Sequence, residues 1–179
     1  MKKYIFKSLL AISLLTIVFI VSCSKENSND KGTSTLHIRM TDGPTYLAEV
    51  NVDLREIRVK FSDDTSSSSG WVTMPTNARV YNLLGLQNGI DTLLATMIFP
   101  KDTLKQIRFV LGPNNSIKDT FGVVYPLTIP SGSESGLKLK VNKKLAATIE
   151  TLLIDFDAAL SVKKEVNGEY KLRPVLKIK

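Results

Sequence analysis

Asp155 and Asp157 are the side chains whose spacing best fits a chemical role. Because they stand two apart in an apolar stretch that predicts a strand, both carboxylates should emerge on one face. With Asp42 or Asp53 beside them they could offer oxygen ligands to calcium, although the spacing lacks the D-x-D-x-D-G loop of an EF-hand. The structural alternative is that Asp42 caps a turn through its own backbone and that Asp155 or Asp157 accepts backbone N–H groups at a strand end. A small hydrolase would need Asp155 and Asp157 to flank a cleft, for which a chain of this size leaves little room.

Histidine and cysteine occur once each, as His37 and Cys23. A zinc site of His and Cys therefore lacks a ligand set. Catalysis by a Ser-His-Asp or Cys-His group would have to use His37 or Cys23. The local alternation points His37 to solvent, and Cys23 is the predicted lipid-attachment residue described below. The Ser/Gly-rich segment 130–136 has no Walker lysine and no helix after it, so it predicts a turn and not a phosphate loop. We therefore expect no enzyme activity and no cofactor, with calcium as the alternative at the carboxylates.

Three aromatic side chains, Trp71, Tyr46 and Tyr81, are the candidates for stacking against a sugar ring. Trp71 is the only tryptophan, and the alternative for it is an anchor in the core or at its rim. These residues would serve a ligand-binding protein and not an enzyme.

Residues 1–22 have the three parts of an export signal. A basic start is followed by an apolar run and a small residue, at Lys2, Lys3 and Lys7, Leu9–Val21 and Ser22. The run is shorter than the about 20 residues that a membrane-spanning helix needs. Ile20-Val21-Ser22-Cys23 resembles a lipobox, whose cysteine is acylated and becomes the first residue of the mature chain. The alternative is an uncleaved anchor helix with an incidental cysteine.

Lipid attachment at Cys23 would hold the protein on a membrane, since each buried CH₂ contributes about 0.8 kcal/mol. Ser24 follows, where an aspartate would favour retention in the inner membrane, so we expect the outer membrane, on its periplasmic or its surface side. Residues 23–33 are polar and predict a flexible tether. Residues 34–179 then form a single domain of ordinary size.

The charge and the composition limit the classes of molecule that this protein is expected to bind. Three of the 24 basic residues belong to the leader, so the mature chain has 21 basic against 17 acidic residues, a net charge of +4. Nucleic acid is not expected as a partner of an exported protein, whereas a weak preference for anionic glycans or lipid headgroups is compatible with this charge. With one cysteine, the domain has no internal disulfide and depends on packing.

A period of two dominates the rest of the chain and predicts short strands separated by turns. The predicted strands lie near residues 36–40, 50–61, 71–74, 93–99, 104–111, 123–129, 137–141, 147–156, 160–166 and 170–178. A phase change predicts a β-bulge near Arg55-Glu56, and Asn167-Gly168 predicts a hairpin. Pro174 predicts an edge or a bulge in the last segment. The pattern favours an all-β fold, an antiparallel β-sandwich.

Several short motifs follow one another along the chain: Thr41-Asp42-Gly43-Pro44, Asn82-Leu83-Leu84-Gly85-Leu86, Asp155-Phe156-Asp157-Ala158 and Tyr170-x-Leu172-x-Pro174 among them. In their order and spacing they resemble the domain-of-unknown-function family 4382 (DUF4382) of bacterial exported lipoproteins. The resemblance covers about residues 34–178. It implies a transthyretin-like or immunoglobulin-like Greek-key sandwich and brings no activity with it.

We therefore expect a non-enzymatic lipoprotein of the cell envelope that binds a glycan or a protein. One alternative is a structural or assembly component that pairs its strand edges with a partner. The other is the small hydrolase built on Asp155 and Asp157.

Overall fold

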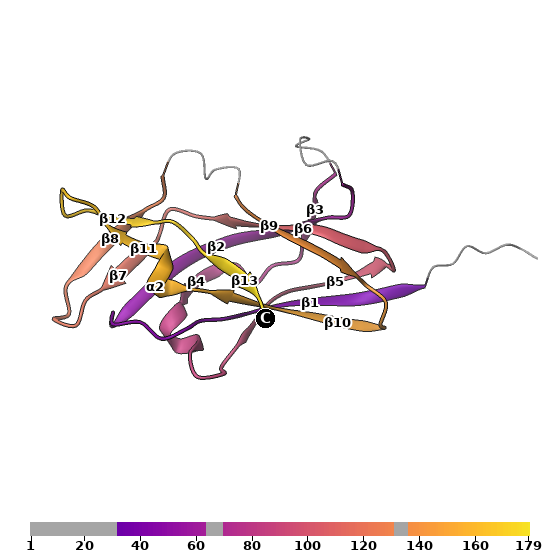
Figure 1. Ribbon diagram of the computed structural model, residues 1–179, viewed down its shortest axis with the longest axis horizontal. Helices are drawn as coiled ribbons and strands as arrows, with labels where there is room; N and C mark the ends of the chain where they lie inside the picture. The colour runs from indigo at the N-terminus through magenta and orange to yellow at the C-terminus, as the bar shows by residue number, and fades with distance from the viewer. Residues whose placement is uncertain (1–31, 64–69, 131–135) are drawn as a thin grey trace, which may run out of the picture. The chain divides into compact units, whose positions relative to one another are not determined.

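The computed structural model describes residues 32–63, 70–130 and 136–179 (Figure 1). The chain divides into two units, Met1–Asp30 and Lys31–Lys179, of which the second is described below. The predicted leader and the lipid-attachment residue Cys23 lie outside the described residues, as does nearly all of the predicted tether. Within the described part, no helix is both long enough and apolar enough to cross a membrane.

Two sheets make up the second unit. The four-stranded sheet has the order β13-β10-β1-β5, formed by Leu176–Ile178, Ile149–Phe156, Thr33–Thr41 and Thr92–Pro100. The nine-stranded sheet has the order β11-β12-β8-β7-β2-β6-β9, formed by Val162–Lys164, Tyr170–Leu172, Val124–Thr128, Ser116–Lys118, Glu49–Lys60, Thr103–Leu111 and Leu137–Lys144. Two further strands, β3 (Val72–Met74) and β4 (Arg79–Asn82), also pair with β2.

The all-β class is confirmed, but the sheets are mixed and not purely antiparallel. β1 pairs in parallel with β10, from Thr35 opposite Ile149 to Thr41 opposite Asp155. β12 pairs in parallel with β8 over two residue pairs. Parallel neighbours need a long crossover connection, and here most of the domain's strands lie in the chain between β1 and β10. Alternation within a strand cannot reveal the direction of its neighbour, so the sequence did not predict this pairing.

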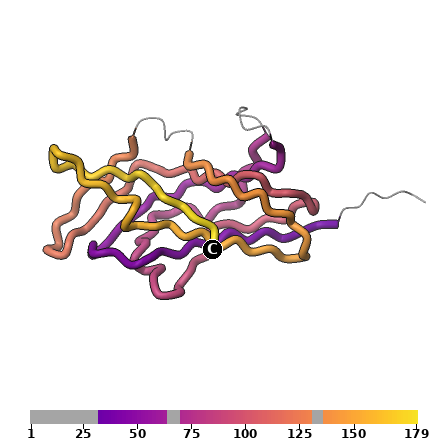
Figure 2. The backbone as a smooth tube through the Cα atoms, in the orientation of Figure 1, coloured from indigo at the N-terminus to yellow at the C-terminus, as the bar shows by residue number. Residues whose placement is uncertain are grey.

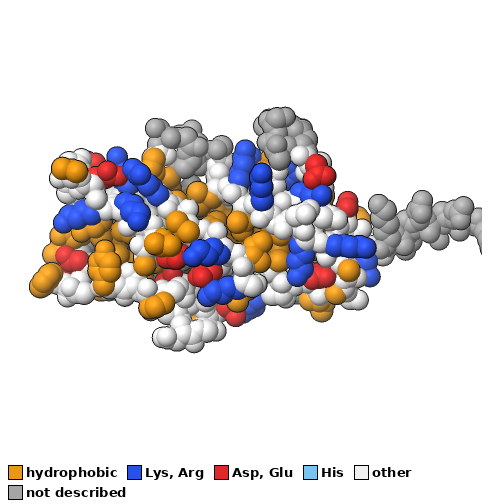
Figure 3. Space-filling model, in the orientation of Figure 1, with side chains coloured by type: hydrophobic (Ala, Val, Ile, Leu, Met, Phe, Trp, Pro, Cys, Tyr) orange, Lys and Arg blue, Asp and Glu red, His pale blue; other side chains and the backbone are white. Residues whose placement is uncertain are grey.

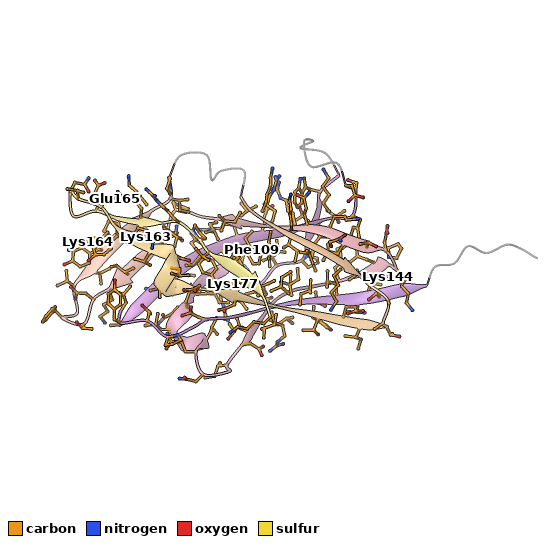
Figure 4. The ribbon with its side chains drawn as sticks, viewed as in Figure 1. Phe109, Lys144, Lys163, Lys164, Glu165 and Lys177 are labelled. Atoms are coloured by element: carbon orange, nitrogen blue, oxygen red, sulfur yellow. The ribbon has the colours of Figure 1, made fainter. Side chains whose placement is uncertain are left out.

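Alternate side chains of both sheets form the core. The inner residues of the small sheet include Leu36, Ile38 and Met40 of β1 and Leu152, Ile154 and Phe156 of β10. They share one core cluster with Ile57 and Val59 of β2 and Ile107 and Phe109 of β6, all buried. Phe109, labelled in Figure 4, is one of the largest fully buried side chains. Removing so much apolar surface from water is what holds a domain without a disulfide together.

The predicted bulge in β2 is present. The pairing of β2 with β6 shifts register between Leu54 and Glu56. Because side chains alternate with a strict period of two, a continuous strand would turn Ile57 and Val59 outward after Val50, Val52 and Leu54 had pointed inward. The extra residue restores all five to the core, where each is at most 2% exposed.

The sequence predicted one strand over residues 170–178, but the structure divides this segment into two strands, β12 and β13. The hairpin at Asn167-Gly168 is confirmed, with β11 antiparallel to β12. Beyond it, the chain leaves the large sheet at Arg173 and joins the small one as β13, antiparallel to β10 (Figure 2). Pro174 cannot donate to a strand ladder, so it lies where the chain passes from one sheet to the other.

Two short helical turns are capped by side chains. The 3₁₀ turn η1 (Leu83–Leu86) begins after Asn82, whose Oδ1 accepts the N–H of Leu84 at 3.2 Å. The turn α2 (Ala158–Ser161) begins after Asp157, whose Oδ1 accepts the N–H of Leu160 at 2.9 Å. Asn and Asp favour such positions because their side chains satisfy N–H groups that a helix leaves free.

Candidate functional site

The carboxylates that could have formed a reactive site are held by the protein itself. Asp157 caps α2, and its Oδ2 lies 3.5 Å from Lys177 Nζ. Asp155 pairs with Lys179 at 3.2 Å. Asp42 is 3% exposed, and its Oδ1 accepts the N–H of Ala158 at 2.9 Å. The structural interpretation therefore holds for Asp157, and the Asp42 carboxylate accepts backbone N–H groups both from the next residue, Gly43, and from the distant Ala158.

This arrangement gives calcium no support. Among the described residues, no group of three or more His, Cys, Asp or Glu side chains is placed to hold a metal ion. Asp53, the other residue considered with them, belongs to β2 in the large sheet. Burial raises the pKa of Asp42, because it disfavours the charged carboxylate. A hydrolase on Asp155 and Asp157 would likewise have to free both side chains from lysine partners.

One of the predicted stacking residues is corrected by the structure. Tyr81 is only 4% exposed, and its hydroxyl donates to the carbonyl of Asn77 at 2.6 Å. It lies on the inward face of β4, opposite Val52 of β2, with Arg79 over its ring. Tyr81 therefore belongs to the core and offers no open ring to a ligand.

Trp71 and Tyr46 lie apart from each other and do not form a platform. Trp71 precedes β3 and is half-buried, with the guanidinium carbon of Arg108 4.1 Å from the ring centre. One face of this ring is thus occupied by the protein's own cation. Tyr46 is 78% exposed in the connection before β2, close to β7 because the N–H of Ala48 donates to the carbonyl of Lys118.

A different aromatic pair lines a surface hollow. Tyr125 of β8 and Tyr170 of β12 have ring centres 5.1 Å apart and planes tilted by 49°. The hollow has a volume of about 350 Å³ and is also lined by Pro126, Thr128 and the hairpin residues Asn167–Glu169. Lys164 Nζ lies 5.5 Å from the centre of the Tyr170 ring. Figure 4 labels Lys163, Lys164 and Glu165 at this hairpin.

The hollow exists because two parallel strands part. β12 and β8 pair only at Tyr170 with Leu127 and at Lys171 with Thr128. Before Tyr170 the chain turns away into the hairpin, where Gly168 has a φ of +87°, a conformation that favours glycine. The space left beside Tyr125 and Pro126 is therefore open to solvent, and exposed apolar side chains mark this end of the sheet in Figure 3.

A second hollow continues from the first. It has a volume of about 490 Å³ and shares Pro126 and Thr128 with the first hollow. Its other residues come from the end of β8 and from the turn after β6: Leu111, Gly112, Pro113, Asn115, Leu127 and Ile129. We call the two hollows together the β8 groove.

A buried polar network fixes the far wall of the β8 groove. Asn115 Oδ1 accepts the N–H of Asp53 at 2.8 Å, and Asn115 Nδ2 donates to the carbonyl of Gly112 at 2.7 Å. Asp53, 1% exposed, accepts the N–H of Asn114 at 3.1 Å and pairs with Arg55 at 2.7 Å. Buried polar groups that are fully paired hold a loop in one conformation.

The β8 groove combines the features of a site for an uncharged, elongated ligand. Tyrosine rings supply apolar faces and hydroxyls, and Asn167, Glu169 and Thr128 supply polar groups beside them. A concave surface with few polar groups among apolar ones is the usual form of a binding site.

Sequence reasoning missed this groove. Tyr125 and Tyr170 fall on the apolar phase of their strands, so their pattern indicates core positions. Both rings do pack against the core, but they lie at its margin. The available signal was the hairpin Asn167-Gly168 next to Tyr170, which placed an aromatic residue beside a solvent-exposed turn.

The fold and the groove define the class: an all-β sandwich domain with a surface groove along β8. The family model described as "Domain of unknown function (DUF4382)" matches residues 33–174, and the chain belongs to this family. The resemblance found in the sequence motifs is thereby confirmed. No curated protein and no solved structure matches the chain, so the transthyretin-like or immunoglobulin-like topology stays a prediction.

Proposed function

We propose that this protein is a non-enzymatic lipoprotein of the outer membrane that binds a glycan chain in the β8 groove. The observation that carries the proposal is the pair Tyr125 and Tyr170, which lines a hollow continuous with a second one. Sugars present flat C–H faces with hydroxyls at the rim, and tyrosine offers an apolar ring with a polar end to match.

The shape of the groove favours a chain over a single sugar. Two hollows that share Pro126 and Thr128 give a path from the hairpin 165–169 to the turn 112–115. The far wall of the groove is preformed, since the polar network of Asp53 and Asn115 holds it. A preformed site loses less conformational entropy when the ligand binds.

The location rests on the sequence. Ile20-Val21-Ser22-Cys23 supplies the lipid-attachment site, and Ser24 favours the outer membrane. Labelling of host cells with a clickable palmitate analogue should mark the wild-type protein and leave the Cys23→Ser variant unmarked. Label on both proteins, or on neither, would contradict the anchor.

The assembly alternative has less support than the groove. β9 ends the large sheet as an eight-residue edge strand, but it carries Lys138, Lys140, Lys143 and Lys144. Asn142 within it has a φ of +53°, where the pairing with β6 also shifts register. Lysines and bulges on an edge strand oppose pairing with a further strand.

The test uses the full chain in detergent against immobilised neutral hexasaccharides: cellohexaose, xylohexaose, maltohexaose and chitohexaose. We expect at least one to bind, and Tyr170→Ala to weaken that binding by about tenfold, the upper value for loss of an aromatic contact. Tyr46→Ala, which removes an exposed tyrosine outside the groove, should bind as the wild type does.

Thr128→Arg is the second variant, because Thr128 is exposed and borders both hollows without contributing to the core. It should block binding while the thermal unfolding temperature stays unchanged. The proposal would be contradicted if both groove variants still bound the sugar as the wild type does. It would also be contradicted if none of the four sugars bound.

A further inference from the structure

Three segments of the chain meet at the end of the domain where β1 begins (Figure 1). In the turn between β5 and β6, the N–H of Lys101 donates to the carbonyl of Gly32 at 3.0 Å. In the segment between β9 and β10, the N–H of Leu145 donates to the carbonyl of Asp102 at 2.8 Å. Backbone hydrogen bonds therefore hold the three segments together. We call residues 32–35, 98–103 and 144–149 the β1 end.

The outer face of the small sheet is apolar at the β1 end. Thr35 of β1 lies opposite Ile98 of β5 on one side and opposite Ile149 of β10 on the other. Ile98 is 63% exposed and Ile149 is 61% exposed. Because neighbouring strands lie about 4.8 Å apart, the two isoleucines stand about 10 Å from each other in one row. Exposed Pro100 extends this surface. Apolar side chains that are exposed together indicate a contact surface, whereas single ones need no explanation.

Two lysines border the same end. Lys101 and Lys144 line a hollow of about 490 Å³, together with Asp102, Thr103, Leu145 and Ala146. Figure 4 labels Lys144, which lies at the end of the molecule where β1 begins. Within the part of the chain that the structure describes, neither Lys101 nor Lys144 forms an ion pair, whereas Lys143 pairs with Glu150 at 3.3 Å. The hollow is thus bordered by two lysines against one carboxylate.

The carboxylates nearby are used by the protein itself. Glu150 Oε1 accepts the N–H of Ala147 at 3.0 Å and that of Ala146 at 3.2 Å, and the hydrogen bond from Ala147 is the largest cause that lowers the pKa of Glu150. Asp102 Oδ1 accepts the N–H of Thr103 at 2.7 Å. Such bonds fix a turn in one conformation. The β1 end therefore presents its apolar and basic side chains on preformed turns.

The length of chain before β1 indicates which surface this end faces. Cys23, the proposed lipid-attachment residue, precedes Gly32 by nine positions, which cover at most about 32 Å of extended chain. β1 is itself nine residues long, about 30 Å, and runs from the β1 end toward the part of the domain that holds β8 and β12 (Figure 1). A lipid on Cys23 therefore holds the β1 end closer to the membrane than the opposite end.

We propose that the β1 end docks onto the surface of the membrane that carries the lipid on Cys23. Ile98 and Ile149 enter the headgroup region, and Lys101 and Lys144 contact the phosphates of anionic lipids. Buried apolar area and attraction to anionic lipids both add to the hold of an acyl anchor. The β8 groove is then directed away from the lipid and open to its ligand. This inference rests on the lipid anchor of the proposed function and not on glycan binding.

The experiment uses the acylated protein, purified from host membranes and reconstituted into vesicles of phosphatidylcholine and phosphatidylglycerol. An NBD fluorophore is attached at Ile98→Cys or at Ile149→Cys. The matched control is Phe121→Cys, since Phe121 is 92% exposed in the turn between β7 and β8. Lipids with a nitroxide near the headgroup should quench about half of the fluorescence at residues 98 and 149 and little at residue 121, because interfacial contacts reach about 5–10 Å into the bilayer.

A second comparison tests the two lysines in the Ile98→Cys protein. Lys101→Gln/Lys144→Gln should weaken docking about tenfold and so reduce the quenching at residue 98. The matched control is Lys163→Gln/Lys171→Gln, a cross-strand lysine pair of β11 and β12, which should leave the quenching unchanged. Vesicles of phosphatidylcholine alone should give the same loss of quenching as the first double variant, since they carry no net charge.

Docking and anchoring can fail separately. Quenching at residue 121 that equals or exceeds the quenching at residues 98 and 149 would overturn the docking while the anchor stands. Equal loss of quenching in the two double variants would overturn the contact of Lys101 and Lys144 with the lipid. Wild-type protein whose Cys23 thiol takes up the fluorophore would overturn the anchor, and the docking with it.

Discussion

Asp42 and Ala158 are joined by a hydrogen bond of 2.9 Å from the Ala158 N–H to Asp42 Oδ1, across 116 residues of chain. The bond ties the end of β1 to the beginning of α2, directly after the strand that pairs in parallel with β1. Gln87 Nε2 lies 3.4 Å from the other carboxylate oxygen. Asp42 is thus a structural residue at the point where the end of β1, η1 and α2 meet.

Replacement of Asp42 by alanine should lower the free energy of unfolding by about 1–3 kcal/mol, because the buried N–H of Ala158 loses its acceptor. Asp42→Asn keeps an acceptor oxygen and is the matched control. Urea unfolding at pH 7 measures both. A loss for Asp42→Asn as large as for Asp42→Ala would show that the charge, and not the hydrogen bond, is what matters.

The pH dependence at Asp42 follows from the direction of its shift. Burial raises the pKa of this carboxyl above its ordinary value of 3.8. The folded state therefore favours the protonated form, and this contribution to stability is full below pH 3.8 and is lost as pH rises through the folded pKa. As pH rises through the folded pKa of Asp42, the free energy of unfolding of the wild type should fall relative to that of Asp42→Asn. A free energy of unfolding that instead rises relative to Asp42→Asn over the same pH range would contradict the raised pKa of Asp42.

Gly136 should tolerate no side chain. Its φ is +75°, and a Cβ would lie 2.7 Å from Arg108 Cγ and 2.8 Å from the carbonyl oxygen of Phe109. Gly122 has a similar φ of +86° with nothing within 4 Å, so Gly122→Ala carries the backbone strain alone. We expect about 1–3 kcal/mol of destabilisation from strain in both variants and a further loss in Gly136→Ala only. Equal unfolding temperatures for the two variants would mean that no close contact exists at Gly136.

Asn115 should control the turn that forms the far wall of the β8 groove. Asn115→Ala removes hydrogen bonds to the N–H of Asp53 and the carbonyl of Gly112, and we expect a loss of about 2 kcal/mol. Asn114→Ala is the control, because Asn114 contributes its backbone N–H to Asp53 and this survives the change. Thermal unfolding compares the two. Similar unfolding temperatures for both variants would show that the side chain of Asn115 does not stabilise this turn.

The sequence predicted the features that depend on local pattern. Alternation located most of the strands but missed the short β4 and β7, the phase change located the bulge before Ile57, and Asn167-Gly168 located a hairpin. The family that the motifs predicted is confirmed, since its model matches residues 33–174. These features follow from side-chain periodicity and from turn conformations, which neighbouring residues determine.

Features that depend on distant partners were not predictable. The parallel pairing of β1 with β10 and the partner of Asp42 join residues more than a hundred positions apart. Tyr81 and Tyr125 occupy the apolar phase of their strands alike, yet one is buried and the other borders a hollow. Which distant elements pack against each side chain decides between these outcomes, and the sequence of a single strand does not encode that.

The central claim is that the β8 groove holds a glycan chain, and amide chemical-shift mapping of the isotope-labelled full chain in detergent tests it most directly. On addition of the hexasaccharide that binds, we predict shifts confined to the amides of the non-proline residues in 124–128, 111–115 and 167–170, which border the groove. Shifts centred on Trp71 or Tyr46, or none with any of the four sugars at millimolar concentration, would contradict the account.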